Sequence, residues 1–94
     1  MTITISVDTA SIRHDLDRHG VDFEYSDGAA RHRVHVPDKV IADHLRVGRL
    51  PGTGAESYVR RVALQIAMLL AGRSFARSLE GDILVDSETL RKVR

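Results

Sequence analysis

The dipeptide Asp27-Gly28 constrains the fold of this chain more than any other feature, because it separates two segments rich in strand-forming residues. Asp-Gly is favoured in two-residue hairpin turns, where the glycine adopts a positive φ without steric cost. The flanking segments 21–25 and 30–36 combine valine and aromatic residues with charged ones. The sequence therefore predicts a β-hairpin centred on this turn.

A two-residue turn imposes one register on the hairpin, in which Ser26 lies opposite Ala29. That register places apolar side chains mostly on one face and brings opposite charges together on the other face. The predicted cross-strand pairs are Phe23 with His32, Val21 with Val34, Glu24 with Arg31, and Asp22 with Arg33.

A further strand is predicted before the hairpin. Polar and apolar residues alternate from Thr2 to Val7, with Ile3, Ile5 and Val7 on the inward side. This period of two is typical of a half-buried strand. Residues 8–20 are rich in charge and histidine, and we interpret them mainly as a surface connection.

Two helices are predicted after the hairpin. A short helix over 37–47 begins with a proline and ends at Gly48, a residue type favoured just past a helix end. Thr53 and Glu56 have the spacing of a capping box, in which each side chain bonds the backbone near the other residue. The capping box predicts the start of a long helix over 55–79.

The chain closes with a predicted strand over 82–86. Its three consecutive apolar residues, Ile83, Leu84 and Val85, are typical of an interior strand covered on both faces. Ser87 is then predicted to cap a final helical turn.

Together these elements predict a single α+β domain over residues 1–94. We expect a mainly antiparallel sheet of about four strands with two helices, one short and one long, on one face. The predicted order is β-β-β-α-α-β.

The composition excludes several classes of protein. The chain has no cysteine, which excludes disulfides and thiolate metal sites. No apolar stretch approaches the ~18 residues of a membrane span, so we expect a cytoplasmic protein that does not enter a membrane. With 14 basic and 13 acidic residues, the formal charge is +1, and the whole molecule has no field that attracts nucleic acid.

No catalytic, cofactor-binding or metal-binding residue is assigned from the sequence. Residues 51–54 resemble the middle of a P-loop, but Ala55 and Glu56 stand where that motif needs Lys and then Ser or Thr, so we expect no nucleotide. His14 and His19 are five residues apart, which does not align them on a helix face. No serine has a neighbouring base, so enzyme activity is not expected, although a site assembled in space stays an open alternative.

Arginines of the predicted long helix suggest a second possible activity. Arg60 and Arg61 lie near its start, and Arg73 and Arg77 are one turn apart near its end. With the basic tail 91–94 they favour nucleic-acid binding as the alternative function. Single-strand binders combine such charges with stacking aromatics, and this chain has only four aromatic residues of the Phe and Tyr types. A solvated helix face is therefore the preferred interpretation, and we expect no nucleic-acid partner.

Several turn and core positions of this chain resemble one family of short proteins. The matching positions are Val21-Asp22-Phe23, Asp27-Gly28, Val34-His35-Val36, Arg61, Ile66-Ala67, and Gly81-Asp82-Ile83-Leu84-Val85. Over roughly Asp17 to Leu90 they resemble the bacterial hypothetical proteins called domain of unknown function 1488. Pro37 departs from the Ser or Thr that usually opens the first helix there. The resemblance implies a small bacterial α+β protein, and it brings no activity and no catalytic residues.

The predicted long helix carries two apolar stripes, which is more apolar surface than one sheet covers. We assign the first stripe to the sheet; it consists of Tyr58, Val59, Val62, Ile66, Leu69 and Leu70. The second stripe has steps of four, three, four and four residues, close to a heptad seam. Its members are Leu64, Met68, Ala71, Phe75 and Leu79.

We expect the second stripe to form the interface of a homodimer, because an uncovered row of large apolar side chains exceeds the patch that a monomer usually exposes. The alternative is that the first helix and residues 8–20 cover this stripe within one chain. The expected function is a non-enzymatic, self-associating interaction module. The partner and the biological process are not encoded in any motif.

Overall fold

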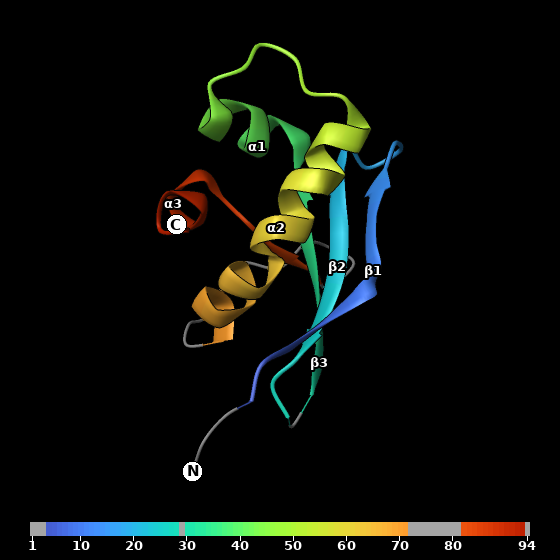
Figure 1. The fold of residues 1–94 in the computed structure, drawn as a ribbon, viewed down its shortest axis with the longest axis vertical. Helices are drawn as coiled ribbons and strands as arrows, with labels where there is room; N and C mark the ends of the chain where they lie inside the picture. The colour runs from blue at the N-terminus through green and yellow to red at the C-terminus, as the bar shows by residue number, and fades with distance from the viewer. Residues whose placement is uncertain (1–3, 29, 72–81, 94) are drawn as a thin grey trace.

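The computed structural model describes residues 4–28, 30–71 and 82–93 (Figure 1). It confirms an α+β fold in which three strands precede two helices, and a short strand and a third helix follow. The elements are β1 (Ser6–Asp15), β2 (Gly20–Ser26), β3 (Arg31–Pro37), α1 (Asp38–Leu45), α2 (Gly52–Ala71), β4 (Ile83–Leu84) and α3 (Ser87–Arg91).

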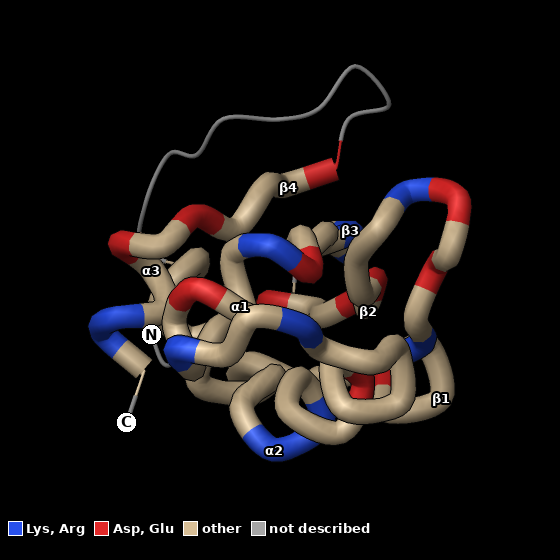
Figure 2. Tube along the Cα trace, turned by 90° about the horizontal axis from the view of Figure 1, so that it is seen from above, with Lys and Arg blue, Asp and Glu red and all other residues tan. Residues whose placement is uncertain are grey.

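The four strands form one mainly antiparallel sheet in the order β1-β2-β3-β4, and the helices lie together on one side of it (Figures 1 and 2). Strand β4 pairs parallel to β3, with Ile83 opposite Val34. The prediction of an interior strand over 82–86 is wrong, because β4 has two residues and lies at the edge of the sheet. Ile83 and Val85 are nevertheless buried in the core, which explains the apolar run.

The predicted hairpin is present, but its connection spans residues 27–30 and its register differs by two residues from the prediction. Phe23 lies opposite Val34 rather than His32, and Val21 lies opposite Val36. A shift of two residues keeps every side chain on its predicted face.

The side chain of Asp27 accounts for the longer connection. Its carboxylate accepts a 2.9 Å hydrogen bond from the N–H of Ala30, and the N–H of Asp27 donates to the oxygen of Ala30 at 3.2 Å. Gly28 has a φ of 91°, in the region predicted for it. The loop therefore closes through an aspartate side chain, and a two-residue turn is not formed.

The new register also changes the predicted ion pairs on the outer face. Glu24 and Arg31 do pair, at 2.7 Å, although they are not directly opposite each other. The Asp22–Arg33 pair does not form, because Asp22 lies opposite His35 and contacts its Nδ1 at 2.7 Å.

The strand predicted over 2–7 is displaced along the chain, because β1 begins only at Ser6 and continues to Asp15. Residues 8–20 are therefore not mainly a surface connection. The strand is interrupted between Asp8 and Arg13, where its pairing with β2 shifts. Within this irregularity the hydroxyl of Ser11 donates to the Asp8 oxygen at 2.6 Å and accepts from the Glu24 N–H at 2.8 Å. A side chain thus replaces a ladder hydrogen bond, which is why the sequence of this strand does not alternate.

Helix α1 ends earlier than predicted, at Leu45 rather than Val47. The residue that ends it is Arg46, which has the left-handed φ of 58°, and the N–H of Val47 bonds back to the oxygen of Ala42 at 3.0 Å. This pattern is a Schellman-type end in which an arginine takes the place usual for glycine. Gly48 therefore does not end the helix.

Helix α2 begins at Gly52, so Thr53 lies inside the helix and the predicted capping box is wrong. The Oε1 atom of Glu56 instead accepts a 3.2 Å hydrogen bond from the N–H of His14 in β1. The carboxylate thus joins the helix to the sheet. The predicted residues 72–79 of this helix lie outside the described residues.

The cap of helix α3 is Asp86 rather than the predicted Ser87. Its Oδ1 accepts from both the N–H and the hydroxyl of Thr89, each at 2.8 Å. These bonds lower the pKa of the Asp86 carboxyl, because they stabilise its charged form.

Helix α2 packs across β1 and β2 and supplies much of the core. Of the stripe assigned to the sheet, Val62 and Leu69 are half-buried, and the other four members are buried. Small residues allow close packing between them, since Ala63 and Ala67 are also buried. The assignment of this stripe to the core is confirmed.

Candidate functional site

The outward side of α2 carries the residues predicted for self-association. Leu64 is 51% exposed and Met68 is 61% exposed, and Ala71 at the end of the helix is also exposed. We call these three residues the α2 apolar face. The remaining two predicted members, Phe75 and Leu79, lie outside the described residues.

A shallow groove of about 420 Å³ adjoins the α2 apolar face. Gln65, Met68 and Leu69 of α2 line one part of it, and Lys92, just after α3, lines the other. The ammonium group of Lys92 lies 3.9 Å from Glu88, so its charge is engaged at the rim. Apart from Lys92, the walls of the groove are largely apolar.

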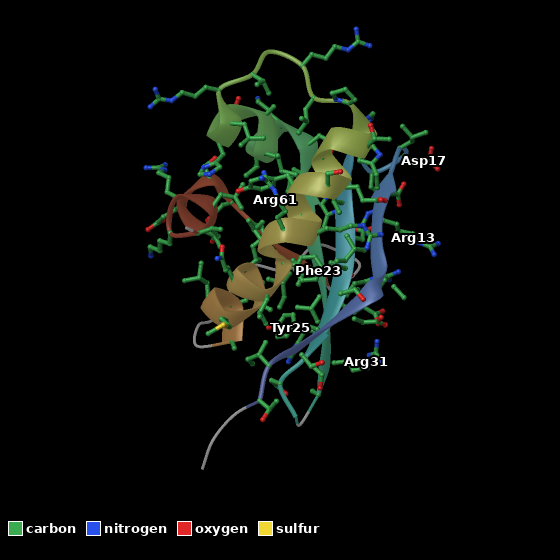
Figure 3. All side chains as sticks on the ribbon, viewed as in Figure 1. Arg13, Asp17, Phe23, Tyr25, Arg31 and Arg61 are labelled. Carbon is green, nitrogen blue, oxygen red and sulfur yellow. The ribbon has the colours of Figure 1, made fainter. Side chains whose placement is uncertain are left out.

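The arginines near the start of α2 have different environments. Arg60 donates 3.1 Å hydrogen bonds to the backbone oxygens of Thr9 and Ile12, in the irregular part of β1. Arg61 lies over the ring of Tyr58 at 6.0 Å, between α2 and the other helices (Figure 3). Burial raises the pKa of Tyr58, and the charge of Arg61 acts in the opposite direction. Arg60 is thus a structural residue, and the predicted pair Arg73 and Arg77 lies outside the described residues.

A network of charged side chains covers the outer face of the sheet. Arg18, in the turn between β1 and β2, lies 2.7 Å from Asp82 and 3.5 Å from Asp22. Asp22 also contacts the buried ring of His35. Sequence reasoning missed this network, since Asp82 lies 64 positions from Arg18.

A concave region of about 550 Å³ lies on the same outer face, beside the irregular part of β1. Arg13 and Arg33 line it together with four carboxylates, those of Asp15, Asp17, Asp22 and Glu24. Over the molecule as a whole, Lys and Arg are interspersed with Asp and Glu (Figure 2). A lining with more carboxylates than guanidinium groups does not favour an anion.

Three of the five histidines, His14, His32 and His35, each form a separate pair with an aspartate. His14 contacts Asp38 at 2.8 Å, His32 contacts Asp27 at 2.9 Å, and both interactions support loop or strand ends. Within residues 4–28, 30–71 and 82–93, no three His, Cys, Asp or Glu side chains gather in a way that could hold a metal ion.

The glycine-rich segment that resembles a P-loop forms the first turn of α2. A Cβ atom on Gly52 would approach Nδ1 of His14 to 2.8 Å, so this glycine allows the helix to pack on the His14 ring. Glu56 is engaged with the His14 N–H and lies 3.6 Å from Arg60. Close packing against His14 therefore explains the glycine at position 52 without a bound phosphate.

No described helix combines the length and apolar character that crossing a lipid bilayer requires.

No family model matches the chain, and no curated protein matches it by sequence. A crystal structure of a protein of unknown function from the DUF1488 family of Shewanella loihica PV-4 is similar, with a TM-score of 0.69. The two proteins are 15% identical, and the match covers 100% of this chain and 99% of the other. The resemblance that the sequence motifs predict is therefore confirmed at the level of the fold: the chain has the α+β fold of a DUF1488-family protein.

Proposed function

We propose that this protein is a small self-associating module of the bacterial cytoplasm that forms a homodimer through the α2 apolar face. The observation that carries the proposal is the exposure of Leu64 and Met68, at 51% and 61%. They lie one helical turn apart on a helix whose opposite side packs in the core. Two large apolar side chains adjacent on one helix form a patch that association removes from water.

A second copy of the chain is the partner that this surface fits. The spacing of Leu64, Met68 and Ala71 continues in the sequence to Phe75 and Leu79 with steps near a heptad. A seam with this spacing packs best against another helix of the same spacing, since each side chain enters a gap between four others. Twofold dimers are the commonest arrangement for such a self-complementary surface.

The groove beside Met68 supports the same proposal. Its apolar walls, from Met68 and Leu69, offer a receptor for one large side chain of the second copy. Lys92 lies at the rim, where a charged group remains hydrated while its aliphatic stem contacts the apolar surface. An interface of this kind has an apolar centre and a polar edge.

Light scattering coupled to size exclusion tests the proposal. We expect a dimer for the natural protein and a monomer for Leu64→Asp and for Met68→Asp, since a carboxylate in an apolar interface loses its hydration. Leu16→Asp is the matched control, because Leu16 is 76% exposed and lies in the turn between β1 and β2. This control stays dimeric.

Both helix variants keep their fold, because the substituted side chains are exposed in the single chain. Circular dichroism and urea unfolding check this point. The proposal is contradicted if the natural protein is a folded monomer at millimolar concentration. It is also contradicted if Leu64→Asp dimerises as well as Leu16→Asp does.

A further inference from the structure

A cleft of about 430 Å³ opens between the end of α1 and helix α3. Asp43, His44 and Arg46 line it from α1 and its cap, and Ser87 and Arg91 line it from α3. The two helices contact each other, so these side chains from distant parts of the sequence face one common space. The volume falls within the range of small-molecule sites.

A second hollow of about 320 Å³ adjoins this cleft, since His44 lines both. Its other walls include Tyr58 and Arg61 of α2 and Val93 near the end of the chain. The ring of His44 lies 6.0 Å from the ring of Tyr58, which fixes its position between the two hollows. Arginines therefore line both hollows that His44 borders: Arg46 and Arg91 line the cleft, and Arg61 lines the second hollow.

These arginines have no described carboxylate within ion-pair distance, in contrast to Arg18, Arg31 and Arg60 elsewhere in the fold. Within the described part of the chain, no ion pair is formed by Arg46, Arg61 or Arg91. Guanidinium groups bind phosphate oxygens through paired N–H donors. Their charges are therefore available to an anion.

The backbone of Arg46 provides an independent observation. Its φ of 58° is unfavourable for a residue with a side chain, and glycine is the usual residue at such a helix end. Arg46 is exposed, so its side chain is not needed for core packing. His19 has a similar φ of 53°, and Arg46 differs from it because its long cationic side chain lines the cleft.

We propose that the cleft lined by His44, Arg46, Ser87 and Arg91 binds the phosphate group of a small phosphate-bearing molecule. The arginines supply charge, and the hydroxyl of Ser87 supplies a further donor. Asp43 lies in the same lining and repels a free anion. It therefore favours a ligand that carries a hydroxyl or amino group beside its phosphate.

A small ligand fits this surface better than a polynucleotide does. Proteins that bind single strands stack bases on exposed aromatic rings. Among the described residues, Phe23, Tyr25 and Tyr58 are all buried, with 1%, 3% and 6% exposure. The cationic groups also lie at two adjoining hollows, whereas a nucleic-acid backbone needs a track of them.

Nuclear magnetic resonance titration with inorganic phosphate and with O-phosphoethanolamine tests the proposal, at constant ionic strength set by sodium chloride. We expect shifts of the Arg46, Ser87 and Arg91 amides that saturate, with O-phosphoethanolamine binding more tightly than phosphate. Asp43→Asn should tighten phosphate binding and remove that preference. Arg91→Gln should weaken both ligands about tenfold, as the loss of one charged contact does.

Arg46→Gly separates a binding role from a structural one. It should raise Tm by about 4 °C, because it removes a left-handed side chain, and it should weaken phosphate binding about tenfold. His19→Gly is the matched control, since His19 has a φ of 53° and lies in the turn between β1 and β2. It should raise Tm and leave the Kd unchanged.

Three results overturn the proposal. The first is equal phosphate affinity in Arg46→Gly, Arg91→Gln and the natural protein. The second is a set of shifts that sodium chloride alone reproduces. The third is tighter binding of a single-stranded oligonucleotide that shifts the same amides, which would assign the surface to nucleic acid instead.

Discussion

Arg18 donates a 2.7 Å hydrogen bond to Asp82, a carboxylate whose side chain is only 2% exposed. The bond joins the turn before β2 to the residue before β4. Through it the residue that leads into β4 is attached to the turn between β1 and β2.

Arg18→Met should therefore lower the free energy of unfolding by about 2–4 kcal/mol, because a buried carboxylate loses its shortest ion pair. Urea unfolding measures the change. The double variant Arg18→Met with Asp82→Leu should recover much of the loss, since neither charge then remains buried. A single variant as stable as the natural protein would show that the pair is not important.

Ser11→Ala should lower the free energy of unfolding by about 1–3 kcal/mol, because it leaves the part-buried N–H of Glu24 without its acceptor. Hydrogen exchange of the Glu24 amide should accelerate together with this loss. Ser57→Ala on the exposed side of α2 is the control and should change little. Unchanged exchange at Glu24 would mean that water replaces the hydroxyl.

Gly28→Val should destabilise the hairpin by about 1–2 kcal/mol, since valine resists the positive φ at this position. Gly48→Val is the matched control, because a Cβ atom at either glycine meets nothing within 4 Å. Only Gly28 of this pair has a positive φ, so the control should cost far less. Thermal unfolding compares the two, and equal losses would contradict a backbone origin.

Asp86→Ala should cost about 1 kcal/mol by removing the cap of α3. The pKa of Asp86 is lowered in the folded protein, so its stabilising effect is present above the ordinary carboxyl pKa of about 4. The stabilising effect is lost as the pH falls from about 4 through the lowered pKa of the folded protein.

The difference in unfolding free energy between the natural protein and Asp86→Ala should therefore shrink on acidification. Asp86→Asn serves as the control, because an amide oxygen caps the helix without titrating. Urea unfolding from neutral to strongly acid pH measures both differences. A difference that grows as the pH falls would be inconsistent with this role of Asp86.

Local patterns in the sequence were enough to predict the element order and the fold class. The Asp27-Gly28 hairpin depends on neighbours in the chain, and so does the buried stripe that includes Val59 and Ile66. Such signals act over a few residues, because strand and helix periods place successive side chains on defined faces. The same local reasoning identified Leu64 and Met68 as outward-facing apolar residues.

Only the tertiary structure decided the interactions that join distant segments. Ser11 bonds to Glu24, Glu56 bonds to His14, and Arg18 pairs with Asp82, across separations of 13, 42 and 64 positions. In the unfolded chain every polar side chain bonds to water, and many other polar groups could replace that water equally well. Packing decides which of these groups becomes the partner. The continuation of β1, the hairpin register and the cleft between α1 and α3 therefore follow from packing, which no local pattern specifies.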